Sequence, residues 1–174
     1  ISDDRHGDSL VMDMTVEDNL ILRDFDRQPF SRNMVLDYRQ AEKRAREALD
    51  EYSIKTSGKS GIKTPVKLMS GGNQQKVILS REISEEAGLI VASQPTRGLD
   101  IGATRFVHET LLRQRDAGRC VLLISADLDE ILGVSDRVAV MYEGRIIGIL
   151  NRDEADVHKI GLLMGGIAKE AADE

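Results

Sequence analysis

The chain of 174 residues is poor in cysteine, proline and aromatic residues, with one Cys, three Pro, no Trp and 3% aromatics. Because Cys120 has no second thiol to pair with, an internal disulfide framework is excluded and a reducing compartment is favoured. The longest apolar runs, such as residues 121–124, fall far short of the roughly 18 residues of a membrane-spanning helix. With 41% hydrophobic residues and so little proline, the composition indicates a globular chain.

A basic surplus is also missing. Lys and Arg number 24 against 30 Asp and Glu, a formal net charge of -6, which argues against a protein that binds nucleic-acid phosphates or an anionic membrane surface. The acidity is uneven, since residues 1–84 carry 14 basic and 14 acidic side chains and residues 85–174 carry 10 and 16. We therefore expect a boundary near residue 84. Because the first residue is Ile1 rather than Met, we also expect a piece of a longer protein.

Periodicity predicts a helical first part and an α/β second part. Helical spacing predicts helices over 15–23, 34–52, 72–87, 101–117, 128–132 and 154–164. Short apolar runs predict strands over 89–92 and 120–124, and a hairpin turning at Glu143-Gly144 is expected between 138–142 and 146–150. The order strand, helix, strand from 89 to 124 predicts a parallel crossover unit. Cys120, at the start of one of these strands, is expected to be an inert core thiol.

Local capping signals support several of these helices. Thr15 is a good N-cap with Asp18 as its capping-box partner. Gly118 is expected to close the helix over 101–117 in the left-handed conformation. These signals fix helix ends independently of the apolar periodicity.

The run Ser70-Gly71-Gly72 at the start of a predicted helix has the composition of an anion-binding site. Glycines allow a phosphate to approach the backbone, the N–H groups of the first helical turn are unpaired donors, and the helix dipole favours negative charge. An ordinary serine-capped helix after a glycine turn explains the same three residues. Residues 73–76 distinguish the anion-binding interpretation from the ordinary capped helix.

Residues 70–76, with the sequence SGGNQQK, resemble the signature motif of ATP-binding cassette (ABC) ATPases, in the form found in the sugar and nucleoside import branch. Further similar stretches follow in the family's order at residues 1–5 (ISDDR), 14–20, 95–100 (PTRGLD, similar to the D-loop), 128–137, 143–146 and 160–164. The chain is thus similar to the C-terminal cassette of a double-cassette importer. The resemblance implies a P-loop NTPase-like α/β fold, with a parallel-sheet core over residues 85–174 and a helical signature subdomain over residues 1–84.

In this family two cassettes form a head-to-tail dimer, and the signature of one covers ATP bound to the P-loop of the other. The resemblance therefore implies that the nucleotide of a partner cassette is contacted by Ser70, Gly71 and Gly72, with Asn73 and Gln74 nearby. Asp100 would reach across the same interface. Asp3 stands where active cassettes carry the Q-loop glutamine, which implies a role in coupling the γ-phosphate to the permease.

Departures from the family pattern imply that the chain's own nucleotide site is degenerate. The P-loop that the family pattern places before Ile1 is expected to be missing from this chain. At the Walker B position, Ser93 replaces the carboxylate that helps to hold Mg²⁺, and Gln94 replaces the carboxylate that acts on the attacking water. Neutral side chains serve both tasks poorly. Ala126 stands where many cassettes have a switch histidine. We therefore expect a site that no longer turns over.

The GKS sequence at Gly58–Ser60 is an alternative P-loop, and with it the chain would be a self-contained NTPase. The Walker pattern requires a glycine where this chain has Ser53, with a strand before the loop and a helix after it. In the resemblance, residues 58–60 belong to the variable loop before the signature.

No metal centre is expected from residues of this chain. His6, His108 and His158 lack the spacing of metal ligands, and the acidic residues near Asp3 lack an EF-hand register. We expect the histidines to be ordinary surface or boundary residues.

The function implied is that of part of the ATP-binding subunit of an importer for nucleosides or simple sugars, nearest to nucleoside importers. ATP and Mg²⁺ would be bound by the full assembly and not tightly by this chain alone. The implied partners are the N-terminal cassette of the same polypeptide, transmembrane permease subunits and, indirectly, a solute-binding protein, at the cytoplasmic face of the membrane and without nucleic acid. A non-catalytic dimerisation or coupling module is an alternative. A cassette of DNA repair or translation is disfavoured by the acidic balance and by the signature sequence.

Overall fold

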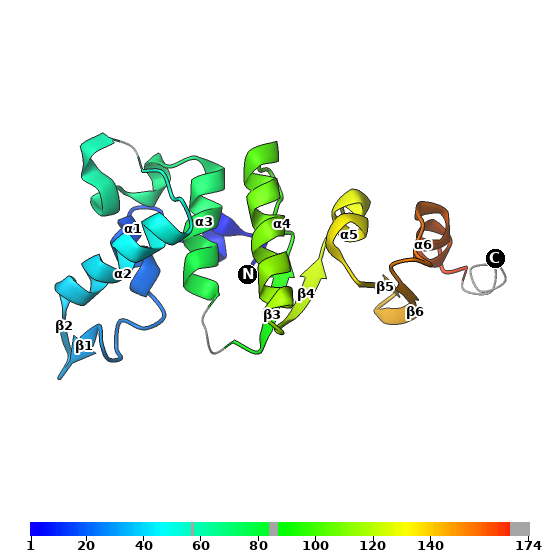
Figure 1. The fold of residues 1–174 in the computed structure, drawn as a ribbon, viewed down its shortest axis with the longest axis horizontal. Helices are drawn as coiled ribbons and strands as arrows, with labels where there is room; N and C mark the ends of the chain where they lie inside the picture. The colour runs from blue at the N-terminus through cyan, green and yellow to red at the C-terminus, as the bar shows by residue number, and fades with distance from the viewer. Residues whose placement is uncertain (57, 84–86, 168–174) are drawn as a thin grey trace. The chain divides into compact units, whose positions relative to one another are not determined.

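The computed structural model describes residues 1–56, 58–83 and 87–167, and it divides into two compact units, Ile1–Leu122 and Leu123–Glu174 (Figure 1). Each unit is described by itself. The boundary near residue 84 is expected from the uneven charge and the change of secondary-structure pattern, and it stays a prediction.

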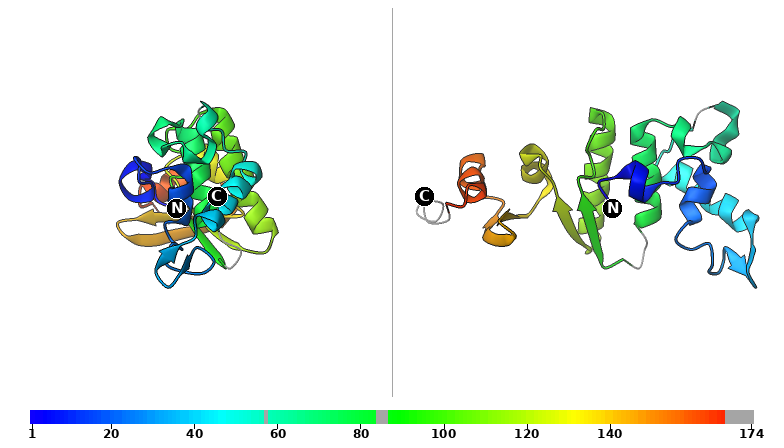
Figure 2. Two further views of the ribbon diagram at one scale, coloured as in Figure 1. Left: turned by 90° about the vertical axis from the view of Figure 1, so that its left-hand side faces the viewer. Right: turned by 180° about the vertical axis from the view of Figure 1, so that it is seen from behind.

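The first unit is mainly helical. Its elements are η1 (Arg5–Ser9, a π-helical turn), α1 (Val16–Ile21), β1 (Ser31–Arg32), β2 (Val35–Leu36), α2 (Tyr38–Glu51), the 3₁₀ turns η2 (Gly58–Lys63) and η3 (Val66–Leu68), α3 (Gly71–Glu82), β3 (Leu89–Ser93) and α4 (Ile101–Asp116). Strand β4 (Cys120–Ile124) is the hydrogen-bonded neighbour of β3. Figures 1 and 2 show α3 beside α4, with η1 close to α3.

The capping predictions for α1 and α4 are confirmed. The Thr15 hydroxyl accepts a hydrogen bond from the N–H of Asp18, and the Asp18 carboxylate accepts one from the N–H of Thr15, a complete capping box. Asp100 caps α4 through the N–H of Ala103 at 2.9 Å. Gly118 follows α4 with φ +83°, the left-handed conformation expected of it.

The start of α2 differs from the prediction. Periodicity placed it at Met34, whereas the helix begins at Tyr38, where Asp37 accepts hydrogen bonds from two backbone N–H groups. The short antiparallel pair β1–β2 occupies residues 31–36 instead, and Met34 at its turn is 99% exposed with φ +63°. The apolar side chain of Met34 therefore belongs to a turn and not to the helix face. Helix α3 ends at Glu82, and residues 84–86 of its predicted C-terminal part lie outside the described residues.

Strands β3 and β4 flank α4 in sequence, as the predicted crossover unit requires. Side chains alternate along β3, with Ile90 and Ala92 buried and Leu89 and Val91 exposed. The expectation of a core thiol is wrong, because Cys120 is exposed. In the described part of the chain β3 and β4 form a sheet of two strands. The large apolar side chains of Leu89 and Val91 on β3 and of Leu122 and Ile124 on β4 are exposed.

The second unit is a hairpin covered by helices. It contains α5 (Leu128–Val134), β5 (Arg137–Tyr142), β6 (Arg145–Asn151) and α6 (Val157–Met164). The predicted turn at Glu143-Gly144 is confirmed, with both residues at positive φ as a type I′ turn requires. The core of the second unit is formed by Val138, Val140, Leu150, Ala155, Ile160 and Leu163. Helix α6 approaches β6 closely, since a Cβ at Gly148 would lie 2.8 Å from Leu163 Cδ1.

A buried carboxylate anchors the turn η2 to α1. Glu17 on α1 is fully buried, and its Oε2 lies 2.6 Å from the Nζ of Lys63, whose side chain is 59% exposed. The hydrogen bond to Glu17 raises the pKa of Lys63 above its ordinary 10.5. Since the folded-state pKa is raised, this contribution to stability is complete below about pH 10.5 and is lost as the pH rises through the folded pKa.

Lys63→Met is expected to lower the free energy of unfolding by about 1–3 kcal/mol, because it leaves the Glu17 carboxylate buried without its cation. Lys67→Met is the matched control, since Lys67 pairs with Asp13 at the same 2.6 Å but both side chains are exposed. The control should change stability little. Urea denaturation at pH 7 and pH 11 measures both variants, and equal effects of the two at pH 7 would contradict the anchoring role.

Candidate functional site

The N-terminus of α3 keeps its backbone donors uncapped. Ser70 occupies the N-cap position with an extended backbone, yet its hydroxyl makes no capping hydrogen bond to the helix. The Ser70 Oγ instead accepts a hydrogen bond from Asn73 Nδ2 at 2.9 Å. The first turn of α3 therefore presents N–H groups with no side-chain cap, together with the positive end of the helix dipole. This arrangement fits an anionic ligand such as a phosphate.

Two polar side chains of the signature face inward and support this turn. The Asn73 Oδ1 accepts a hydrogen bond from the Lys55 N–H at 2.8 Å, which fixes the side chain that holds Ser70. Gln74 is only 4% exposed. Its Nε2 donates to the carbonyls of Val66 and Met69 at 3.1 and 3.3 Å. The buried Gln74 side chain thus connects the first turn of α3 to the residues that precede it.

Glycine allows the first turns of α3 and α4 to meet. A Cβ built at Gly72 would lie 2.7 Å from the Cβ of Ala103 and 3.7 Å from Asp100 Oδ2. At Gly71 the nearest atoms, among them Leu99 Cδ2, would lie 3.9 Å away, an ordinary contact distance. The signature and the D-loop are therefore brought together within one unit, and exposed Ser70 and Asp100 mark the two helix starts.

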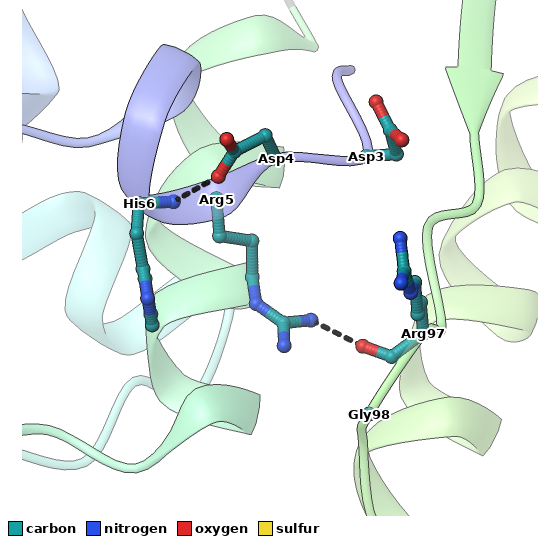
Figure 3. A pocket seen from close by; sticks show the side chains of 6 residues that line it. All are labelled: Asp3, Asp4, Arg5, His6, Arg97 and Gly98. Atoms are coloured by element: carbon teal, nitrogen blue, oxygen red, sulfur yellow. Dashed lines mark hydrogen bonds between the residues drawn. The ribbon is translucent and has the colours of Figure 1, made fainter.

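A shallow polar cavity opens beside the D-loop, lined by Asp3, Asp4, Arg5, His6, Arg97 and Gly98 (Figure 3). The Arg5 Nη1 donates to the carbonyl of Arg97 at 2.7 Å. The N–H groups of Gly7 and His6 donate to Asp4 and lower the pKa of its carboxyl. The structure places Asp3 at the edge of this cavity, directly before Asp4, the N-cap residue of η1.

The two residues that the resemblance aligns with the Walker B carboxylates have neutral side chains. Ser93 is the last residue of β3, partly buried, and its N–H donates to the carbonyl of Ile1 at 3.0 Å. Gln94 follows with φ +46°, and its carbonyl accepts a hydrogen bond from the N–H of Arg97. Ala126 lies in the second unit, exposed, between β4 and α5. Among the described residues, no three His, Cys, Asp or Glu side chains gather closely enough to hold a metal ion.

The GKS sequence does not have the surroundings of a P-loop. Gly58–Lys63 form the 3₁₀ turn η2, which comes after α2 and before the turn η3. A phosphate-binding loop of this type joins a strand to an α-helix. The backbone here therefore gives no support to the self-contained NTPase.

Sequence reasoning missed the contacts of three residues. Arg5 had no role beyond its motif, and His6 was expected to be an ordinary surface residue, yet the His6 Nε2 lies 3.2 Å from Gln74 Oε1. Lys76 places its Nζ 4.4 Å from the ring centroid of Phe106 and donates to the carbonyl of Ser53. Burial lowers the pKa of Lys76. The partners of all three lie far away in the sequence, so no local signal identifies them.

Known proteins similar to this chain are import ATP-binding proteins. It is 44% identical over 172 residues to the guanosine import ATP-binding protein NupO of Bacillus subtilis, a match over 99% of this chain and 33% of that protein. The nucleoside import ATP-binding protein NupA of Lactococcus lactis is 43% identical, over 95% of this chain and 32% of that protein. The ribose import ATP-binding protein RbsA of Clostridium perfringens is 37% identical, over 96% and 32%. The chain thus spans about a third of the length of these curated relatives.

Solved structures give the fold. A dimeric ATP-binding cassette bound to ADP and Pi matches with a TM-score of 0.62 and 20% identity, over 82% of this chain and 59% of that one. The ADP conformation of a cassette from an ABC transporter matches with a TM-score of 0.63 and 20% identity, over 93% and 62%. No protein-family model matches the chain.

The fold is therefore that of an ABC ATPase cassette, which confirms the predicted α/β class. By sequence, the chain is a homologue of nucleoside and sugar import ATP-binding proteins over nearly its whole length. In the part of the chain that the structure describes, no helix combines the length and apolarity needed to cross a bilayer.

Gly72→Ala is expected to lower the free energy of unfolding by about 1–3 kcal/mol, because the new methyl group collides with Ala103 and separates α3 from α4. Gly133→Ala, inside α5 with open space around the added Cβ, is the matched control and should be neutral or slightly stabilising. Thermal unfolding of the two variants measures the difference. A neutral Gly72→Ala would show that α3 and α4 do not meet at this glycine.

Proposed function

We propose that the chain is part of the ATP-binding subunit of an importer for nucleosides or simple sugars, and that the start of α3 covers ATP held by a partner cassette. The uncapped first turn of α3 with the exposed Ser70 carries this proposal. Relatives named for guanosine and nucleoside import are 44% and 43% identical, against 37% for a ribose importer, which favours nucleosides.

The geometry of the signature suits recognition of a phosphate. Asn73 donates to the Ser70 oxygen, so the hydroxyl proton of Ser70 is directed to another acceptor such as a phosphate oxygen. The backbone N–H groups at Gly71 and Gly72 add donors without side chains in the way. Gln74 holds this turn from beneath. Asp100 lies beside Gly72 and would approach the partner across the same interface.

The chain's own nucleotide site is proposed to contribute little to turnover. Bound Mg²⁺ would neutralise phosphate charge in the full assembly. At the Walker B position Ser93 offers no anionic oxygen to that ion. Gln94 can orient a water molecule but cannot accept its proton, and Ala126 has no imidazole to replace a switch histidine. The result would be an asymmetric ATPase with one productive site.

The partners follow from the same proposal. The signature needs a second cassette that holds ATP, and relatives about three times as long as this chain leave room for an N-terminal cassette in the same polypeptide. The helical part, residues 1–84, would dock permease subunits at the cytoplasmic face of the membrane, and a solute-binding protein would deliver the solute. Asp3 would link the γ-phosphate to the permease.

Gly71→Ala in the full-length protein is expected to abolish ATP hydrolysis, although the Cβ meets only ordinary contacts at 3.9 Å within this chain. Ser70→Arg should have the same effect, because both changes fill the space meant for a phosphate of the partner's nucleotide. Gln94→Ala should change the rate little, since this site is proposed to be degenerate. Steady-state phosphate release measures all three variants.

Gly133→Ala serves as the control, because it adds the same methyl group in open space on another helix. The asymmetric ATPase is excluded by the opposite ranking, in which Gln94→Ala stops turnover and the two signature variants do not.

The chain alone is expected to bind Mg-ATP negligibly, because the covering residues of α3 act on nucleotide held by another cassette. Isothermal titration calorimetry tests this directly. Micromolar affinity would contradict the proposal and restore the P-loop interpretation of residues 58–60. Comparing hydrolysis with and without a partner cassette separates an ATPase half from a purely structural coupling module.

A further inference from the structure

We propose that Arg5 and His6 are positioning residues that hold the D-loop and the signature helix at a fixed separation for covering the partner's nucleotide. Both residues lie in the turn η1, which contacts α3. The inference rests on the proposed function of the signature, and it adds two residues that do not themselves touch nucleotide.

Arg5 links η1 to the D-loop across 92 residues of sequence, through the 2.7 Å hydrogen bond from its Nη1 to the carbonyl of Arg97 (Figure 3). Its Nη2 lies 3.4 Å from the position of a Cβ at Gly98 and 3.9 Å from that of a Cβ at Gly71. The guanidinium therefore lies between the D-loop and the first residue of α3. Gly98 has φ +69°, a left-handed backbone conformation that favours glycine, and a Cβ there would lie at an ordinary contact distance from Arg5.

His6 links the same turn to the signature. Because Gln74 Nε2 faces two carbonyls, its Oε1 must face His6, and an amide oxygen only accepts. The His6 Nε2 therefore carries the proton and donates to Gln74 at 3.2 Å. Gln74 in turn binds the carbonyl of Met69, directly before Ser70. His6 thus acts on the signature through one intervening side chain.

The turn that carries both residues is itself fixed. The Asp4 carboxylate accepts hydrogen bonds from the N–H groups of His6 and Gly7 at 3.0 and 2.8 Å. A side chain at Gly7 would collide with that carboxylate. Since Asp3 immediately precedes this turn, a displacement of Asp3 would be passed to the D-loop through Arg5 and to the signature through His6.

The test uses the full-length protein and follows kcat and KM for ATP, thermal unfolding, and hydrogen exchange of residues 95–100 and 66–74. Arg5→Ala and His6→Leu should each lower kcat about tenfold, with KM changed by less than about twofold, because the lost contacts align groups for the transition state. His6→Gln keeps an N–H donor at the position of Nε2 and should recover most of the rate.

Hydrogen exchange in two segments distinguishes the Arg5–Arg97 contact from the His6–Gln74 contact. Arg5→Ala should speed exchange over residues 95–100, and His6→Leu should speed it over residues 66–74. Arg105→Ala and His158→Leu are the matched controls, since Arg105 is exposed and pairs with Glu109 along α4, and His158 is exposed in the second unit. Neither control should alter kcat or exchange in these segments.

Ser70→Arg in the same assay separates the two levels of the proposal. If Ser70→Arg stops hydrolysis while Arg5→Ala and His6→Leu do not change kcat, the positioning role is refuted and the covering function stands. Retained hydrolysis in Ser70→Arg refutes the covering function, and the positioning role with it. A fall in kcat that His6→Gln fails to rescue, matched by an equal loss of thermal stability, shows a purely structural role and also overturns the inference.

Discussion

The contact between Gly72 of α3 and Ala103 of α4 is the constraint on which the candidate site depends. It lets two helix N-termini approach until the residues that start them, Ser70 and Asp100, share one surface. Each helix start is a local feature of the sequence, with its own cap residue. Their close approach requires a position without a Cβ, since any side chain at Gly72 would enter the volume of Ala103.

Around this contact, exposed and buried polar groups have separate tasks. Ser70 is exposed at the start of α3, whereas the side chains of Asn73 and Gln74 form hydrogen bonds within the protein. A neutral serine ends β3 and a neutral glutamine follows it, at the positions where the resemblance expects two carboxylates. The start of α3 therefore combines an exposed serine with uncapped N–H groups, whereas the end of β3 offers neutral side chains, and this asymmetry is the physical basis of the proposed division of labour.

Much of the fold is predictable because its signals are local. The capping box at Thr15, the left-handed glycine at Gly118 and the turn at Glu143-Gly144 depend on backbone groups within a few residues, and each occurs as predicted. Helix α2 starts later than predicted. The apolar side chain of Met34 matches the helical period of the residues after it, although Met34 lies in a turn. The prediction of a buried Cys120 fails, because an apolar run does not specify which of its side chains are covered by other elements.

The sequence by itself determined the resemblance to ATP-binding cassettes, the order of the similar stretches, the neutral residues Ser93 and Gln94, and most helix ends. Only the tertiary structure decided that Gln74 points inward, that Arg5 reaches the D-loop and that His6 supports the signature. The reason is the separation along the chain: the Arg5 and His6 contacts span 92 and 68 residues. Pairing at such distances is set by how α3, α4 and η1 pack together, and no periodicity or cap in a single segment encodes it.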